Sequence, residues 1–343
     1  MQRYLNSGQT PWSLNTIQKE YRDLLLKELG KSIKLAERDS CLCGSSSTEI
    51  LAKIDRFGLP FNSYICRECG LIFTSPYIHE DSLVKYYSEY YHPLTFGSVK
   101  PVDSLFERGQ GRKIFRLLYP YITKEKISVF ELGAGTGSNL IEFSREAEAQ
   151  GVKTVLFGLE YNEKYVESGK RRGISLSCLP LAQYAQNARE KFDVIILSHV
   201  LEHFTDIESN IGFIRKISKN DALVYVEVPG VLDLKYRYVY DCDFLKYLTH
   251  AHVFNFSQST LKSTLARFGL KMMHGNEKIE AVFVFEDVEQ QSALDVCESY
   301  VEIMRYLKDL EEKLSYYQSK NPNKRLVNRL KTAIYGKLRG MRK

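Results

Sequence analysis

A glycine-rich turn between a buried strand and a helix is the feature that most restricts how this chain can fold. In the segment VFELGAGTG, an apolar run reaches Glu131, and three glycines follow at alternate positions, Gly133, Gly135 and Gly137. Glycines let the backbone turn tightly and approach a ligand closely, and the start of the next helix presents unpaired N–H groups and a positive dipole end. The turn therefore predicts a ligand-binding loop.

Short β-rich runs alternate with amphipathic helices from residue 126 to residue 288. The runs cover 127–132, 154–160, 192–197, 222–228 and 279–286. They are nearly continuous in apolar residues, which suits strands covered on both faces. The alternation predicts an α/β fold with a doubly wound parallel sheet. Residues 229–256 show little periodicity and are expected to form a long connection, a kind of segment that often carries function.

The second strand ends at Glu160, about 20 residues past the glycine turn. A carboxylate at that position can accept hydrogen bonds from ribose hydroxyls, so the ligand is predicted to be a nucleoside with an anionic or carboxylate end. A dinucleotide fingerprint would place glycine or alanine where this chain has Ser138. A nicotinamide dinucleotide also fits the geometry of the turn, despite this mismatch, and is the alternative ligand.

Four of the seven cysteines are clustered in two short pairs, which points to a metal site. Cys41 and Cys43 form C-x-C, Cys66 and Cys69 form C-x-x-C, and a glycine follows each pair. The spacing is close to that of a zinc ribbon, in which each turn supplies two thiolates to a tetrahedral ion. Four closed ligands predict a structural Zn²⁺. The cysteines could instead be free thiols, or another ligand could replace Cys41.

The charge distribution is uneven along the chain of 343 residues. The net charge is +6, but residues 320–343 hold nine basic side chains and no acidic one, which leaves about −3 for the remainder. A nucleic-acid-binding domain would spread positive charge over its fold, so a nucleic-acid partner is not expected. No apolar run reaches the ~18 residues of a membrane span. Without a signal-like apolar segment at the start, a cytoplasmic location is expected.

The basic C-terminal segment, 323–343, has the pattern of an amphipathic helix. Apolar residues recur every three or four positions after Pro322, and basic residues occupy the other faces. Such a helix can lie on an anionic membrane surface, which would place the protein at the cytoplasmic membrane face. It could also pack within the protein or in a homodimer, or bind a polyanion.

The order E-x-G-x-G-x-G resembles motif I of the class I S-adenosylmethionine-dependent methyltransferases. Three further stretches resemble the same family in the correct order, FDVIILSHVLEHFTDI (192–207), LVYVEVPG (223–230) and HVFNFSQSTLKSTLARFGLKMM (252–273). The resemblance covers about residues 105–288 and implies a Rossmann-like methyltransferase sheet. It implies that the three glycines line the methionyl part of the cofactor, with Glu131 at its amino group and Glu160 at the ribose. It also implies Leu179 beside adenine, and Ser198 and His199 beneath the sulfonium.

The cysteine pairs resemble those of a subgroup with an N-terminal zinc-ribbon domain, which includes methyltransferases of nucleotide-sugars, deoxysugars and surface polysaccharides. There, C-x-x-C-G-L-x-F is followed by a proline and a tyrosine-rich helix similar to SLVKYYSEYYH (82–92). That helix and the zinc domain would form one wall of the acceptor pocket, although the tyrosines could instead only pack the two domains together. The acceptor would be a small-molecule or lipid-linked glycan.

The same resemblance implies that His252 acts as the catalytic base, with His199 as a second candidate. The zinc-domain sugar C-methyltransferases carry a glutamate before this histidine, and Ala251 stands there in this chain. Methylation of oxygen is therefore favoured over methylation of carbon. The chain could also be an RNA methyltransferase, or a non-enzymatic protein that only binds the cofactor.

These observations divide the chain into five parts. They are an N-terminal helical segment (1–40), a zinc-ribbon-like domain (41–76), a helical linker and pocket wall (77–125), the methyltransferase domain (126–288), and a C-terminal helix with the basic tail (289–343).

Overall fold

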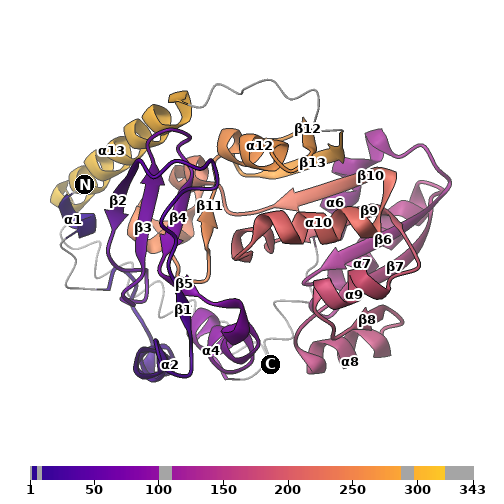
Figure 1. Ribbon diagram of the computed structural model, residues 1–343, viewed down its shortest axis with the longest axis horizontal. Helices are drawn as coiled ribbons and strands as arrows, with labels where there is room; N and C mark the ends of the chain where they lie inside the picture. Colours follow the sequence, from indigo (N-terminus) through magenta and orange to yellow (C-terminus); the bar gives the residue numbers. More distant parts are fainter. Residues whose placement is uncertain (1, 6–9, 100–109, 287–296, 321–343) are drawn as a thin grey trace.

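The chain folds around two β-sheets that are linked by helices and long connections (Figure 1). The structure is a computed structural model, and it describes residues 2–5, 10–99, 110–286 and 297–320. The larger sheet is built from residues 126–285, and the smaller one from three strands between residues 48 and 75 together with the strand at 254–255. The predicted α/β fold is confirmed.

The larger sheet has seven strands in the order β12-β13-β10-β9-β6-β7-β8 among the described residues. Their bounds are β6 Lys126–Leu132, β7 Lys153–Leu159, β8 Ser175–Ser177, β9 Phe192–Ser198, β10 Ser218–Glu227, β12 Leu270–His274 and β13 Glu280–Phe285. The five predicted runs all form strands. The expectation of a parallel sheet is wrong for β13, which runs antiparallel to both β10 and β12. A short turn joins β12 to β13, and such a connection can only reverse the chain.

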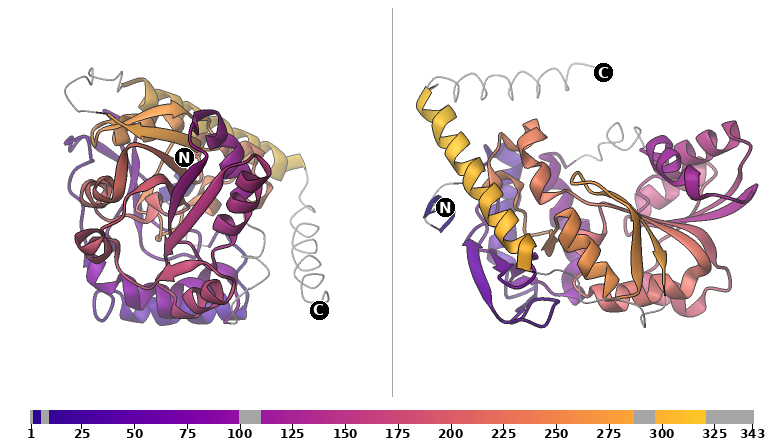
Figure 2. Two further views of the ribbon diagram at one scale, coloured as in Figure 1. Left: turned by 90° about the vertical axis from the view of Figure 1, so that its right-hand side faces the viewer. Right: turned by 90° about the horizontal axis from the view of Figure 1, so that it is seen from above.

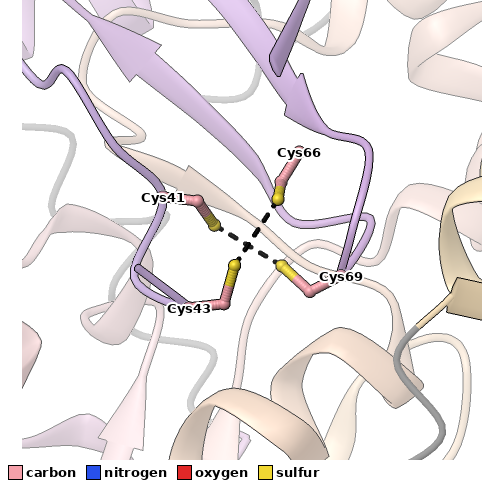
Figure 3. Close-up of side chains that lie close together, drawn as sticks. All are labelled: Cys41, Cys43, Cys66 and Cys69. Carbon is pink, nitrogen blue, oxygen red and sulfur yellow. Dashed lines mark hydrogen bonds between the residues drawn. The ribbon is translucent and has the colours of Figure 1, made fainter. Parts of the chain in front are cut away.

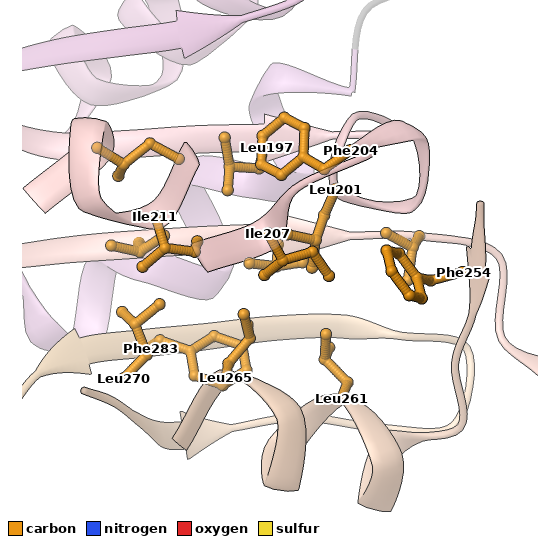
Figure 4. Close-up of a cluster of buried hydrophobic side chains, with 14 of the residues drawn as sticks. Leu197, Leu201, Phe204, Ile207, Ile211, Phe254, Leu261, Leu265, Leu270 and Phe283 are labelled. Atoms are coloured by element: carbon orange, nitrogen blue, oxygen red, sulfur yellow. The ribbon is translucent and has the colours of Figure 1, made fainter. Parts of the chain in front are cut away.

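Helices cover both faces of this sheet, as expected for strands that are apolar on both sides. They are α6 Gly111–Leu118, α7 Ser138–Ala149 and α8 Glu163–Arg171 on one face, and α9 Leu181–Asn187, α10 Ile207–Ile217 and α12 Gln258–Ala266 on the other. The core under α10 and α12 consists of buried apolar side chains from both helices and the sheet (Figure 4). Asp206 and Ser257 start these two helices by accepting hydrogen bonds from N–H groups of the first turn.

The smaller sheet has four strands in the order β11-β4-β3-β2. Their bounds are β2 Thr48–Ala52, β3 Asn62–Cys66, β4 Ile72–Ser75 and β11 Phe254–Asn255. A separate pair, β1 Leu35–Ala36 and β5 Tyr77–Ile78, lies next to it, and α2 Thr16–Glu28 precedes both. The N-terminal segment 1–40, expected to be helical, thus contains the helix α2.

The connection 229–256 is not an unstructured loop. It contains two 3-10 segments (Val231–Tyr236 and Tyr238–Tyr240), the helix α11 Phe244–Tyr247, and the strand β11. Phe254 of β11 pairs with Phe73 of β4, so the connection supplies an edge strand to the sheet of the N-terminal region. Sequence periodicity missed these elements because each is too short to complete a helical or alternating pattern.

Helix α13 Cys297–Lys320 lies diagonally across the N-terminal sheet (Figure 2). Ile303, Leu307 and Leu310 are buried there against residues of β2, β3 and the 231–248 region, together with Tyr4 of α1 Gln2–Leu5. Residues 290–319 carry an apolar stripe that includes Leu294, Val301 and Leu307, which predicts one helix that begins near residue 290 and buries Val301. Val301 is 48% exposed, and Ile303 takes its place, because the helix docks by a face turned toward Ile303.

The tyrosine-rich segment forms the helix α3 Leu83–Tyr86, a π-helical turn Tyr87–Tyr91, and the helix α4 His92–Phe96. The predicted basic tail, 323–343, and Leu294 lie outside the described residues. Within the part of the chain that the structure describes, no helix combines the length and the apolar character needed to cross a membrane.

Candidate functional site

The glycine turn follows β6 and adopts a backbone that side chains would strain. Gly133, Gly135 and Gly137 have φ values of 69°, 53° and 77°, all in the left-handed region. A Cβ atom added at Gly133 would lie 2.8 Å from Cγ2 of Val200. The turn thus needs glycine for its conformation and for its close approach to the loop after β9. It ends at the first turn of α7, as the sequence predicts.

One of the two carboxylate oxygens of Glu131 accepts a hydrogen bond from the described residues, and the other does not. The residue is buried, and Nδ2 of Asn139 donates to Oε1 at 2.7 Å, while Oε2 accepts no hydrogen bond within the described parts of the chain. Burial raises the pKa of Glu131 to about 8, although the hydrogen bond from Asn139 opposes this shift. An unsatisfied carboxylate oxygen beside the glycine turn suits the ammonium group of a methionyl ligand.

Glu160 stands at the carboxyl end of β7 and is bound by the glycine turn itself. The N–H of Gly135 donates to Oε2, and the N–H of Asn162 donates to Oε1, both at 2.9 Å. Burial raises the pKa of Glu160 above its usual value, although the hydrogen bonds from these backbone donors oppose the shift. Each carboxylate oxygen has a second lone pair, which leaves acceptors for ribose hydroxyls.

Leu179 and Ser198 lie at the same edge of the sheet, Leu179 two residues past β8 and Ser198 as the last residue of β9. The N–H of Glu160 donates to the carbonyl of Ser177, which places the 178–179 segment beside Glu160. Leu179 is partly buried at the rim of the core. Ser198 donates to Oε2 of Glu227 at 3.3 Å. The cofactor-binding residues predicted from the sequence therefore come together at the carboxyl ends of four neighbouring strands, the usual ligand position in such sheets.

His199 follows Ser198 directly, in a conformation uncommon for a residue with a side chain. Its φ is +58°, and its backbone N–H donates to the carbonyl of Glu227 at 2.7 Å. The side chain is 43% exposed and lies between two carboxylates, with Nδ1 3.5 Å from Oε1 of Glu202 and Nε2 3.9 Å from Oε1 of Glu227. Desolvation lowers the pKa of His199, but the two carboxylates outweigh it, so the pKa is raised above 6.5.

His252 is buried behind His199, and the two are connected through Glu202. Nε2 of His252 lies 4.0 Å from Oε1 of Glu202, and Nδ1 accepts or donates no hydrogen bond within the described ranges. Burial and the neighbouring His203 lower the pKa of His252 well below 6.5, so the ring is neutral near pH 7. The structure thus brings both predicted catalytic histidines to one cluster, with His199 on its accessible side.

His250 is occupied at both ring nitrogens. Nδ1 lies 2.7 Å from Oδ2 of Asp55, and Nε2 lies 2.8 Å from the hydroxyl of Tyr86, all of them buried. Asp55 also accepts hydrogen bonds from the N–H groups of Phe57 and Leu59. This chain of hydrogen bonds fastens the connection before β11 to the N-terminal sheet and to the tyrosine segment.

The tyrosine segment contacts the histidines on its other side. The rings of Tyr87 and Tyr91 each lie 6.1 Å from the ring of His203, in edge-on arrangements. A cavity of about 10 Å³ lies between the tyrosine segment and the histidines, and Tyr86, Tyr87 and His203 are among the residues that line it. Tyr86 and Tyr90 are buried and pack the segment onto the N-terminal sheet.

The four clustered cysteines converge on one point between the hairpin loops of the N-terminal region (Figure 3). The sulfur atoms of Cys41 and Cys69 are 3.4 Å apart, and those of Cys43 and Cys66 are 3.5 Å apart. Zn–S bonds of ~2.3 Å in a tetrahedron require sulfur separations of about 3.8 Å, a few tenths of an ångström more. The hydrogen bond from Cys41 lowers the pKa of Cys69 to about 6. The four thiols therefore fit a structural zinc ion, and Cys41 is among them despite the short C-x-C pair.

Several residues of the site were not found from the sequence. Arg172 of the turn after α8 donates to Oγ1 of Thr136 at 3.0 Å and to Oγ of Ser138 at 2.9 Å, so it supports the glycine turn. Nζ of Lys113 lies 2.9 Å from Oε1 of Glu227. Both basic residues come from helix ends far from the glycine turn in sequence, so no local pattern points to them. Asn139, which donates to Glu131, is close to it in sequence and could have been found from that spacing.

Residues 106–274, just under half of the chain, match the family described as a methyltransferase domain. No curated protein matches the chain. Among solved structures, the chain is similar to the 1,6-didemethyltoxoflavin-N1-methyltransferase of Burkholderia thailandensis (14% identity, TM-score 0.43, 63% of this chain and 96% of that one). It is also similar to a SAM-dependent methyltransferase from Archaeoglobus fulgidus (19%, 0.38, 62% and 92%). A match to coclaurine N-methyltransferase (13%, 0.29, 33%) spans only 34% of that chain.

The family match, the sheet order and the glycine turn together define an S-adenosylmethionine-dependent methyltransferase. Its cofactor is S-adenosylmethionine, and the unsatisfied oxygen of Glu131 and the two acceptors of Glu160 fit the ammonium and ribose groups. When bound, the cofactor supplies an electrophilic methyl group on a sulfonium. The residues of this chain hold it and orient it.

The raised pKa of Glu131 predicts a pH dependence of stability. Below about pH 4.5 the carboxyl is neutral in both states, and as pH rises to about 8 only the unfolded chain loses the proton. A difference of one in pKa between the folded and unfolded states corresponds to about 1.4 kcal/mol. We therefore expect the free energy of unfolding to fall by a few kcal/mol from pH 5 to pH 8. Glu131→Gln should remove this slope in denaturant titrations without cofactor. Equal slopes in the two proteins would contradict a neutral Glu131.

Glu160→Gln is expected to weaken cofactor binding by about 10- to 100-fold, because hydrogen bonds to a charged acceptor contribute about 1.5–3 kcal/mol each. The NH₂ group of the glutamine would also face a backbone N–H whose hydrogen bond the carboxylate now accepts. Calorimetric titration with S-adenosylhomocysteine measures the effect. Glu163→Gln, at an exposed position at the start of α8, is the matched control and should bind normally. Normal binding by Glu160→Gln would remove this carboxylate from the cofactor site.

Proposed function

We propose that the enzyme transfers the methyl group to a hydroxyl of a sugar, a nucleotide-sugar or a surface glycan. The observation that carries the proposal is the exposed imidazole of His199 at the end of β9, beside the cofactor-binding edge. A sugar hydroxyl is a poor nucleophile near neutral pH, and an imidazole within reach can take its proton as it attacks. The resemblance of the cysteine pairs and the tyrosine segment to sugar-associated methyltransferases supports the same class of acceptor.

In the proposed reaction the acceptor oxygen attacks the methyl carbon as the carbon–sulfur bond breaks. The hydroxyl proton passes to Nε2 or Nδ1 of His199, and the products are a methyl ether and S-adenosylhomocysteine. Because the displacement is in line, positioning of the acceptor does much of the catalytic work. His252 is buried and reaches the reaction only through Glu202, so we assign it a role behind His199.

The tyrosine segment is proposed as the wall of the acceptor pocket. Tyr87 and Tyr91 are only partly buried and lie against His203, next to the catalytic cluster. Their rings offer apolar faces and their hydroxyls offer hydrogen bonds, a combination suited to a sugar ring. Tyr86 and Tyr90 instead serve the packing of the segment.

The acceptor class can be tested directly. Enzyme incubated with methyl-labelled S-adenosylmethionine and separate pools of nucleotide-sugars, lipid-linked glycans or RNA should label the sugar-containing pools. Mass spectrometry of the product should place the methyl group on oxygen. Label found only in RNA, or on carbon, would contradict the proposal.

The basic segment 323–343 lies outside the described residues, and its sequence supports a further part of the proposal. We propose that it binds the anionic surface of a membrane, which would bring the enzyme to a lipid-linked acceptor. The full chain should co-sediment with vesicles of anionic lipid, while a chain ending at residue 319 should not. Equal binding by both would rule the segment out.

A further inference from the structure

One carboxylate and two imidazoles converge behind the predicted cofactor site. Glu202 and His203 lie in the 3-10 turn Leu201–His203 that follows β9, and His252 lies in the turn that precedes β11. Each offers a ligand atom, and these three atoms lie within 4.8 Å of one another. Nε2 of His203 is 3.9 Å, and Nε2 of His252 4.0 Å, from the same oxygen of Glu202.

The carboxylate of Glu202 has no hydrogen-bond donor in the described structure. Its side chain is 2% exposed, and neither Oε1 nor Oε2 accepts a hydrogen bond from the described residues. A buried polar group without a hydrogen bond costs free energy, and the imidazole of His199 approaches Oε1 of Glu202 only to 3.5 Å. The arrangement would be satisfied by a cation placed among Glu202, His203 and His252.

The hydrogen bond of His203 prepares its ring for a metal. Nδ1 lies 2.8 Å from the carbonyl oxygen of Ala251, which can only accept, so Nδ1 carries the proton. Nε2 then carries a lone pair directed toward Glu202 and His252. A ring nitrogen freed by a hydrogen bond from the other nitrogen to a carbonyl is the usual arrangement of a metal-binding histidine.

We propose that Glu202, His203 and His252 bind one divalent transition-metal ion of the zinc class. Two imidazoles and one carboxylate suit Zn²⁺, Fe²⁺ or Co²⁺, whereas Mg²⁺ and Ca²⁺ prefer sites built of oxygen. Bonds of 2.0–2.1 Å in a tetrahedron place ligand atoms about 3.3 Å apart, so each imidazole nitrogen, now 3.9 or 4.0 Å from Oε1 of Glu202, would approach that oxygen by less than an ångström. This site is separate from the four cysteines and has three protein ligands, which leaves a coordination position open.

His199 lies on the accessible side of these ligands, with its Nδ1 3.5 Å from Oε1 of Glu202. A metal ion there would hold an acceptor oxygen and lower its pKa, which helps a hydroxyl to attack. This consequence rests on the proposed function. The binding of the ion does not, and it would hold for any acceptor.

Metal counting on the full chain tests the site. The folded protein, dialysed against Zn²⁺ without prior treatment by a chelator, should bind two ions per chain by elemental analysis. His203→Ala combined with His252→Ala should bind one, because the four cysteines are unchanged in that variant. His274→Ala, at an exposed histidine of β12, is the matched control and should bind two. One ion per wild-type chain, or two in the double variant, would overturn the proposal.

A second measurement uses the wild-type chain, so it does not depend on the variants folding. Protein whose thiols already hold Zn²⁺ is given one equivalent of Co²⁺, and X-ray absorption reads the cobalt ligands. We expect nitrogen and oxygen at about 2.0–2.1 Å and no sulfur shell near 2.3 Å. Unbound cobalt, or cobalt with sulfur ligands, would overturn the site. Both measurements are independent of methylation, so a wrong acceptor class would leave them unchanged.

Discussion

His199→Ala should lower kcat by about 10²–10⁴-fold, the usual contribution of a positioned general base. The affinity for S-adenosylhomocysteine should stay near that of the wild type, because the cofactor contacts lie in the glycine turn and at Glu160. As the pH is lowered, the wild-type kcat should begin to fall at a pH above 6.5. The base must be unprotonated to act, and the pKa of His199 is raised above 6.5. Steady-state kinetics across pH and calorimetry measure these effects.

The control for this prediction is His79→Ala. His79 is also partly exposed beside a carboxylate, Asp81, but it lies at the start of the tyrosine segment and contacts no cofactor residue in the described structure. Its substitution should leave kcat unchanged. If His199→Ala kept kcat within a few-fold of the wild type, the proton would have to leave by another route, and His199 would lose its assigned role.

Removal of zinc from the four cysteines should unfold the N-terminal sheet. Structural zinc contributes about 10–16 kcal/mol of apparent binding free energy in zinc-finger peptides, as much as the whole stability of many domains. Cys66→Ser should therefore lose one zinc ion and lower the melting temperature by about 10 °C or more. Activity should fall too, because β11, two residues after His252, pairs with β4 of that sheet. Elemental analysis and calorimetric melting measure the result.

Cys178→Ser provides the matched control, because Cys178 is exposed and lies outside the cluster. Its zinc content and melting temperature should not change. If Cys66→Ser kept both its zinc content and its melting temperature, the four residues would be free thiols rather than a metal site.

The cofactor half of the site could be predicted because its signals are local. The residues from Glu131 to Glu160 form one strand, one glycine turn, one helix and a second strand, and each side chain owes its position to the backbone next to it. The turn needs glycine for its positive φ values, and a strand end places the carboxylate. The cysteine cluster was predictable for the same reason, since two tight turns bring each pair together.

The histidine cluster could not be predicted in the same way, because its members come together through packing. His252 meets Glu202 only after the connection 229–256 adds a strand to the N-terminal sheet, and His250 meets Asp55 across 195 residues of sequence. Exposure decides the chemistry of each imidazole, and no sequence pattern encodes exposure.

The amino-acid sequence by itself determined the α/β architecture, the cofactor loop and the thiol cluster, since periodicity and short turns act between near neighbours. Only the tertiary structure decided that His199 stays accessible while His252 is buried beside the carboxylate of Glu202. Burial and charge pairing depend on every element that packs around a side chain, and those elements come from distant parts of the chain.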